Sequence, residues 1–211
     1  MIQTENLKQL IEETMKLYAD FSVPAQNVSE VDVTYLLHGG DMELGLQCGL
    51  YHDWKMQQAR KREQSVLRKN SKTYRKIFRQ NQHITKIESY VKEKLDVVFW
   101  ALHQGEFCYL FPFSKEGFPY PTYCYVTHSR EDRVTEEYMV TSDQILYERY
   151  VPLNPTETMW EFVDYVPGGT HAVRSYAKGI FTQSDSLMLT MLEKSAWQES
   201  GHENLLQTVI Q

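Results

Sequence analysis

The sequence predicts an α+β protein: a helical N-terminal half with one long amphipathic basic helix, an antiparallel sheet in the C-terminal half, and a closing C-terminal helix. Two observations support this class. Before Asp96 apolar residues recur mainly at helical spacing, whereas after it short β-rich runs are joined by brief links. We therefore expect a helical region over residues 1–96 and an antiparallel β region with a C-terminal helix over 97–211, folding as one cooperative unit.

The N-terminal half is expected to begin with two short helices. Apolar residues at helical spacing from Leu7 to Tyr18 indicate an amphipathic helix over Asn6–Asp20. The next segment, SEVDVTYLL at residues 29–37, is interpreted as a short helix, although Val33 and Tyr35 also alternate as they would in a strand. Asp41, after two glycines, fits the N-cap of the helix that follows.

The segment from Asp53 to Leu95 lacks proline and predicts one long helix, or two helices joined near Asn70. At 100° per residue its apolar side chains fall on one side, which would pack on the rest of the domain or pair with another helix. The residues that we predict for such helix pairing are Tyr74, Ile77, Ile84 and Val91.

The C-terminal half changes to the period of strands. A hairpin is expected around Gln104-Gly105, and three further β-rich runs, TYCYVTHS, RVTEEYMVT and QILYERYV, suit an antiparallel meander. The segment from Asn154 to Gly169 has the cap, proline and glycine signals of a helix. The segment HAVRSYAKGIFT that follows is expected to form the last strand. Residues 184–198 are expected to form the closing helix, capped by Ser184.

Charge is distributed unevenly along the chain. The segment from Lys55 to Lys86 contains eleven Lys or Arg and one acid, Glu63, so it carries +10 and leaves −16 for the rest of a chain with a total of −6. On a continuous helix these cations would form a line roughly 38 Å long, opposite the apolar side. The residues that we predict for nucleic-acid binding are Lys61, Arg68, Lys72, Arg75, Lys76, Arg79 and Lys86.

This charge layout favours a non-enzymatic binding or regulatory protein whose cationic helix docks on a polyanion, nucleic-acid backbone first. No helix-turn-helix spacing is present, so backbone or single-strand binding is the version that the sequence supports. Three alternatives stay open: an acidic protein surface as the partner, an assembly module that forms homo-oligomers through the long helix, and a solvated charge run without a partner. A fourth is a small-ligand-binding or enzymatic domain on the sheet, around His103, Cys108, Tyr125 or Glu137.

No motif in the chain fixes a reaction. Cys48 and His52 lie four residues apart and could join other Cys or His side chains at a zinc ion, but a buried thiol and an unrelated polar histidine are the favoured interpretation. Glu136 and Glu137 are adjacent, so on a strand they would face opposite sides of the sheet. The sequence therefore predicts no catalytic residue, no metal site and no cofactor, without excluding an enzyme.

The three cysteines are too few and too widely spaced for a disulfide framework. The start of the chain is acidic and amphipathic, unlike a signal peptide, and no apolar run approaches the roughly 18 residues of a membrane span. We therefore expect a cytoplasmic protein that has no membrane partner.

Overall fold

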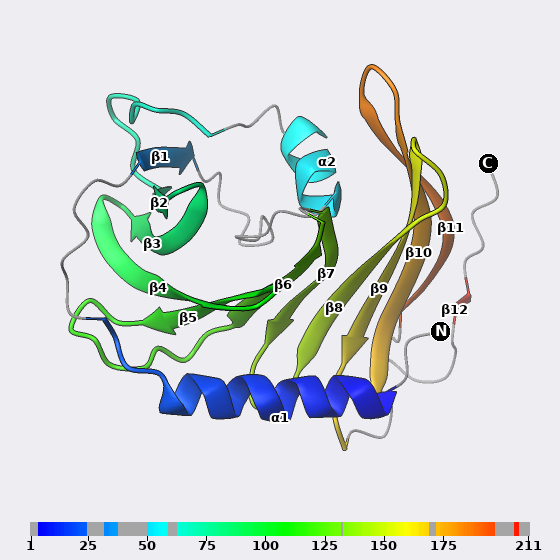
Figure 1. Ribbon diagram of the computed structural model, residues 1–211, viewed down its shortest axis with the longest axis horizontal. Helices are drawn as coiled ribbons and strands as arrows, with labels where there is room; N and C mark the ends of the chain where they lie inside the picture. Colours follow the sequence, from blue (N-terminus) through cyan, green and yellow to red (C-terminus); the bar gives the residue numbers. More distant parts are fainter. Residues whose placement is uncertain are drawn as a thin grey trace.

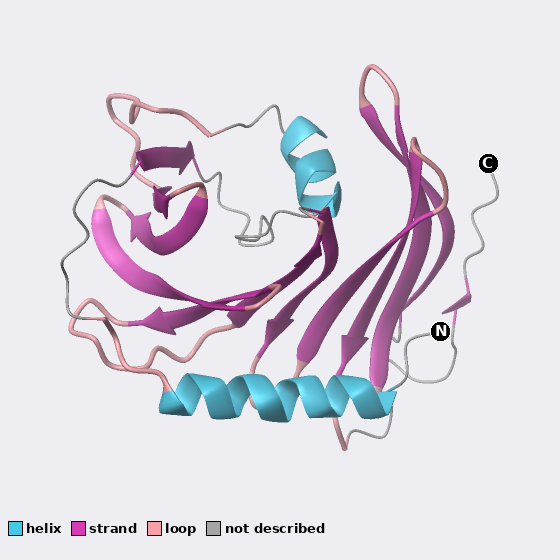
Figure 2. Ribbon diagram, viewed as in Figure 1, coloured by secondary structure: helices cyan, strands magenta, loops and turns pink. Residues whose placement is uncertain are grey.

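A computed structural model describes residues 4–24, 32–37, 50–58, 63–131, 133–168, 172–196 and 205–206. Within these ranges the chain forms one twelve-stranded antiparallel sheet and two helices (Figures 1 and 2). Strand order follows the sequence, so the sheet is a continuous meander. The elements are α1 (Thr4–Asp20), β1 (Asp32–Leu37), α2 (Leu50–Gln58), β2 (Tyr74–Gln80), β3 (His83–Val91), β4 (Lys94–Gln104), β5 (Phe107–Phe113), β6 (Cys124–Arg130), β7 (Arg133–Val140), β8 (Ile145–Pro152), β9 (Glu157–Tyr165), β10 (Val173–Gln183), β11 (Leu187–Ala196) and β12 (Leu205–Leu206).

The predicted α+β class with a helical N-terminal half is wrong, because most of the described chain is sheet. The first helix is confirmed as α1, and the strands predicted around 104–105, in the three β-rich runs and in HAVRSYAKGIFT are confirmed as β4 to β8 and β10. The short helix at 29–37 is instead the strand β1. The expected boundary near Asp96 lies inside β4, so one sheet runs through it.

The predicted long helix over 53–95 is replaced by α2, a connecting segment and the strands β2 and β3. Asn81 and Gln82 join these strands with φ angles of 50° and 68°, and the next turn has Lys92 at 51° and Glu93 at 66°. Two consecutive residues with positive φ are the mark of a type I′ turn, whose twist matches that of the flanking strands. Neither pair is the usual Asn-Gly, so the hairpins gave no strong sequence signal.

One face of the sheet packs against α1. Alternate residues of six consecutive strands, β4 to β9, turn toward this helix and form a core that is rich in aromatic side chains. From α1, Leu7 and Ile11 enter this core, and Thr14 on the same side of the helix is also buried. In Figure 1 the helix runs beneath the strands along the lower side of the molecule. We call this side the α1 face.

The opposite side, the α2 face, carries two smaller cores. Met56 of α2 packs with residues of β1 to β6, including Ile77 and Phe99, and a second core gathers Tyr150, Trp160 and residues of β10. Leu50, Tyr51 and Trp54 of α2 pack against this second core. In Figure 1 the helix α2 lies inside the curve of the sheet, between its two arms.

The helices predicted over 154–169 and 184–198 are wrong, since they are β9 and β11. In β9, Trp160 belongs to the α2-face core and Val163 to the α1-face core. In β11, Leu189 packs against the α2-face core whereas Met188 and Leu192 are exposed. The cap signal at Asn154 is used differently, because its side-chain oxygen accepts a hydrogen bond from the Thr156 amide at 3.0 Å, within a turn.

Candidate ligand pocket between α2 and the sheet

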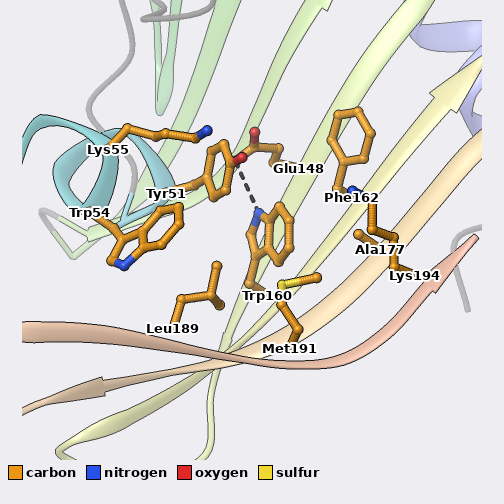
Figure 3. Close-up of a pocket in the computed structure, with 10 residues that line it drawn as sticks. All are labelled: Tyr51, Trp54, Lys55, Glu148, Trp160, Phe162, Ala177, Leu189, Met191 and Lys194. Atoms are coloured by element: carbon orange, nitrogen blue, oxygen red, sulfur yellow. Dashed lines mark hydrogen bonds between the residues drawn. The ribbon is translucent and has the colours of Figure 1, made fainter. Parts of the chain in front are cut away.

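A pocket of about 380 Å³ lies on the α2 face, between helix α2 and strands β8 to β11. Helix and sheet each supply part of its wall, and aromatic and aliphatic side chains make up most of it (Figure 3). Its lining residues are Tyr51, Trp54, Lys55, Glu148, Trp160, Phe162, Ala177, Leu189, Met191 and Lys194.

The helical wall consists of Tyr51, Trp54 and Lys55. Residues three and four positions apart share one side of a helix, which explains why these three side chains point together at the sheet. The ring of Tyr51 stacks on that of Trp160 with centroids 4.8 Å apart and planes at 3°. The Trp54 ring lies 5.7 Å from Tyr51. Three aromatic side chains from two elements therefore make one continuous surface.

The sheet wall follows from the pairing of the strands. Glu148, Phe162, Ala177 and Lys194 are successive cross-strand partners on β8, β9, β10 and β11. The neighbouring row on the same face is Tyr150, Trp160, Gly179 and Met191. Three strand spacings separate the two ends of a row, which is about 14 Å. Glu148 and Lys194 therefore stand at opposite ends of the pocket.

Gly179, the cross-strand partner of Trp160 and Met191, allows β10 and β11 to approach closely beside the pocket. A Cβ atom added at this position would lie 2.8 Å from Leu189 Cδ1 and 2.9 Å from the backbone oxygen of Thr190. The strand register also shifts between Lys178 and Gly179. The glycine thus lets the wall that carries Leu189 lie against the β10 backbone.

Two sets of hydrogen bonds fix α2 above the sheet. Near its start, the Tyr51 amide donates to the hydroxyl of Tyr150 at 3.4 Å, so a donor that the helix itself cannot pair finds a partner. Near its end, the Gln57 side chain donates to the Leu187 carbonyl at 3.2 Å and accepts from the Leu187 amide at 3.1 Å. The side-chain amide of Gln57 therefore pairs with both backbone groups of Leu187, the first residue of β11, in the way that the backbone of a neighbouring strand does. This pairing attaches the helix to β11.

Glu148 is the acidic group of the pocket. Its Oε2 accepts hydrogen bonds from the Tyr150 hydroxyl and, at 3.1 Å, from Trp160 Nε1. Burial raises the pKa of this carboxyl above its ordinary value, although the two hydrogen bonds and the charge of Lys55 act in the opposite direction. The environment therefore favours the neutral carboxylic acid more than water would.

Two lysines supply positive charge from different walls. Lys55 is partly buried, and its ammonium lies 5.4 Å from the Tyr51 ring centroid and 5.7 Å from that of Trp54. Lys194 is exposed at the β11 end and forms no ion pair with any described residue. The lining thus has two ammonium groups and one carboxyl group that burial drives toward its neutral form.

The structure distributes the predicted nucleic-acid-binding residues over a loop and two strands rather than along one helical face. Arg68 and Lys72 are exposed in the connecting segment, Lys76 is partly buried on β2, and Lys61 lies outside the described residues. Arg75 is only 5% exposed, so its side chain is buried within the fold. Their role in binding nucleic acid stays a prediction, but the linear arrangement on which it was based does not exist.

The last two of these cations have acidic partners in the same molecule. Arg79 donates to both carboxylate oxygens of Glu63 at 2.8 Å. Lys86 Nζ lies 2.8 Å from Glu88 Oε1 and 4.1 Å from the ring centroid of Phe78. Part of the positive charge that was predicted to lie along one exposed helical face is therefore paired with acidic side chains of the same molecule.

The residues predicted for helix pairing lie on β2 and β3. Ile77 is 4% exposed within the core and Ile84 packs against it, whereas Tyr74 stacks on Tyr90 at 4.7 Å between centroids. Val91 is 43% exposed at the strand end. These side chains do not form one surface, and the pairing of subunits stays a prediction.

Of the residues considered for zinc, Cys48 lies outside the described part of the chain, and so does Asp41, the predicted N-cap. His52 is partly buried on α2, and Cys124 is fully buried, so burial raises its pKa to about 12. No group of three or more Cys, His, Asp or Glu side chains suited to a metal ion occurs among the described residues. Neither described helix is long and apolar enough to cross a membrane.

The adjacent acids separate as expected for a strand. Glu136 faces the α1 side, where its carboxylate lies 3.3 Å from His128 Nδ1, and Glu137 lies near the Tyr150 hydroxyl on the α2 face. None of the positions named for a ligand or enzyme site on the sheet lines the pocket. His103 lies on β4 and Cys108 on β5, whereas the sheet residues of the pocket begin at β8.

Sequence reasoning missed the pocket residues because it assigned most of them to helices. Trp160 and Phe162 fell in the predicted helix over 154–169, and Leu189, Met191 and Lys194 in the closing helix. A usable signal was present: Trp160 and Phe162 are two residues apart, as are Val163 and Tyr165, which suits a strand that is buried on both faces. Comparison with protein-family models, curated proteins and solved structures gives no significant match.

Proposed function

We propose that this protein binds a small, largely apolar organic molecule in the pocket between α2 and strands β8 to β11. The observation that carries the proposal is the lining: seven of its ten residues are aromatic or aliphatic, and the other three are the charged residues Lys55, Glu148 and Lys194. A volume of about 380 Å³ falls in the range of roughly 300–1,000 Å³ that is usual for small-molecule sites.

The arrangement supports binding in two further ways. The aromatic stack of Tyr51 on Trp160 and the hydrogen bonds of Gln57 hold the helix in place, so the site is formed before a ligand arrives. The tryptophans Trp54 and Trp160 both face the pocket, which gives binding an optical signal in the protein itself.

The test uses N-phenylnaphthylamine (NPN), a neutral aromatic probe whose fluorescence rises in apolar surroundings. We expect saturable binding of one NPN per chain, with quenching of tryptophan emission. Met191→Trp fills the pocket with a larger side chain and should weaken binding at least about 10-fold. Met188→Trp is the matched control, because Met188 lies on the same strand but is 50% exposed.

Equal NPN binding by the Met191→Trp and Met188→Trp proteins would overturn the proposal, as would the absence of any saturable signal. Circular dichroism and thermal melting of both variants show that each is folded, so loss of binding is not mistaken for loss of structure.

Polyanion binding is a second candidate function, favoured by three exposed cations in one connecting segment. Arg68, Lys69 and Lys72 form no ion pair with a described residue. We propose that they contact phosphates, and that replacing all three by Glu abolishes binding of single-stranded DNA or RNA at low salt. Absent binding by the parent protein, or affinity that does not change with salt, would refute this candidate.

A further inference from the structure

We propose that the ligand of the α2 pocket is an organic anion with a flat, aromatic or conjugated body, and that Lys194 holds its charged group. This inference rests on the proposed binding function and adds the chemical class of the ligand.

The charges favour an anion over a cation. Lys194 lines the β11 end and has no ion-pair partner among the described residues. At the β8 end, Lys55 interacts with the Glu148 carboxyl and lies over two aromatic rings. Lys194 is therefore the ammonium of the lining that is left for an anionic group, which needs such a partner when it leaves water.

An aromatic lining can also attract cations, but here a cation of the protein itself already lies over the rings. The ammonium of Lys55 already lies over the rings of Tyr51 and Trp54, at 5.4 and 5.7 Å from their centroids. A cationic ligand would meet this ammonium and Lys194 as like charges. The aromatic surface therefore remains available for a neutral or anionic ring system.

The shape of the lining explains the flat body. Trp54, Trp160 and Phe162 present rings on one side, and Leu189 and Met191 present aliphatic side chains below them (Figure 3). Stacked and edge-to-face aromatic contacts stabilise more than their buried area alone, so a ring system gains from this wall. The row from Glu148 to Lys194 spans about 14 Å. This length accommodates an apolar ligand body between Glu148 and a charged ligand group that is bound at Lys194.

The experiment compares two probes that differ by one anionic group. Anilinonaphthalene sulfonate (ANS) is NPN with an added sulfonate, so the ratio of their affinities isolates the contribution of the charge. We expect the parent protein to bind ANS about 10-fold more tightly than NPN. Lys194→Gln should lower this ratio about 10-fold, and Lys194→Glu should lower it further. Lys115→Gln is the control, since Lys115 is exposed in the loop after β5 and pairs only with Glu116 among described residues.

The outcomes separate the two proposals. If NPN binds in the pocket as tightly as ANS, or if the ratio is the same in Lys194→Gln and Lys115→Gln, the anion inference is wrong and the binding function stands. If neither probe binds, or if Met191→Trp does not affect NPN binding, the binding function itself is wrong. A ratio that falls in the Lys194 variants alone supports the inference.

Discussion

Glu137 and Glu148 lie directly opposite each other as cross-strand partners on β7 and β8, and the hydroxyl of Tyr150 reaches both carboxyl groups. Glu137 is 3% exposed, and burial raises the pKa of Glu148. Like charges in this position destabilise a sheet. The pair therefore makes the edge of the candidate pocket sensitive to the protonation of Glu148.

Replacing Glu148 with Gln should stabilise the protein near pH 8, by about 0.2–1 kcal/mol. A carboxyl whose pKa is raised in the folded state contributes stability that is fully present below its ordinary value of 4.5 and is lost as pH rises through the folded value. The amide removes that loss and can still accept hydrogen bonds from Tyr150 and Trp160. Urea unfolding at pH 5 and pH 8 measures it. Glu131→Gln, at an exposed turn, serves as the control, and an equal gain there would contradict the explanation.

His52 should make the protein less stable in mild acid. Burial lowers its pKa from 6.5 to about 4, and the nearby charge of Arg75 acts in the same direction. The unfolded chain then takes up a proton at a higher pH than the folded one, so stability is full above pH 6.5 and is lost as pH falls toward 4. The loss is at most about 1.4 kcal/mol per pH unit.

The variant His52→Leu should remove most of this dependence between pH 7.5 and pH 5, measured by urea unfolding. His83→Asn changes an exposed histidine and should leave the dependence in place. If the two variants show the same slope as the parent protein, His52 is not its cause.

The Arg149 and Glu161 pair on the α1 face should show the asymmetry of a buried charge. Glu161 is 3% exposed, accepts from Arg149 Nε at 3.0 Å and has Lys178 Nζ at 3.9 Å. Arg149→Met leaves the carboxylate with the more distant Lys178 and the hydrogen bond of Tyr176, and should cost about 3 kcal/mol. The double variant Arg149→Met, Glu161→Met should recover much of this in chemical denaturation. A double variant that is less stable than the single one would contradict the argument.

Gly179→Ala should destabilise the protein by about 1–3 kcal/mol and weaken NPN binding. The new Cβ would lie 2.9 Å from the Thr190 carbonyl, a backbone atom that cannot turn away, so β11 must move from β10. Thermal unfolding measures the loss, with Thr182→Ala further along the same strand as a control. Native stability in Gly179→Ala would show that the two strands can separate at no cost.

The helix and strands that were predicted correctly have clear local signals in the sequence, namely apolar periodicity and turn residues. α1 shows one apolar stripe, which includes Leu7 and Ile11, and the structure buries that stripe. The hairpin at Gly105 has a residue that accepts its φ of 58° without strain. In such segments the period and the turn residues indicate the same element, so no distant contact is needed to decide.

Where the prediction failed, two local interpretations were both consistent with the residues. The basic segment has apolar residues at Tyr74, Ile77 and Phe78, which suit a helix and also a strand that is buried on both faces. In the structure Ile77 faces one core and Phe78 the other side, where Lys86 lies over its ring. Two of the cations expected along one helical face instead pair with acids, Arg79 with Glu63 of the connecting segment and Lys86 with Glu88 on the same strand.

The sequence by itself determined α1, the strands from β4 to β8 with β10, and the concentration of positive charge between Lys55 and Lys86. Only the tertiary structure decided that β9 and β11 are strands and that Trp54, Trp160 and Lys194 line one pocket. The physical reason is that periodicity reports contacts within a few residues, whereas strand pairing and the docking of α2 are contacts between residues up to 130 positions apart.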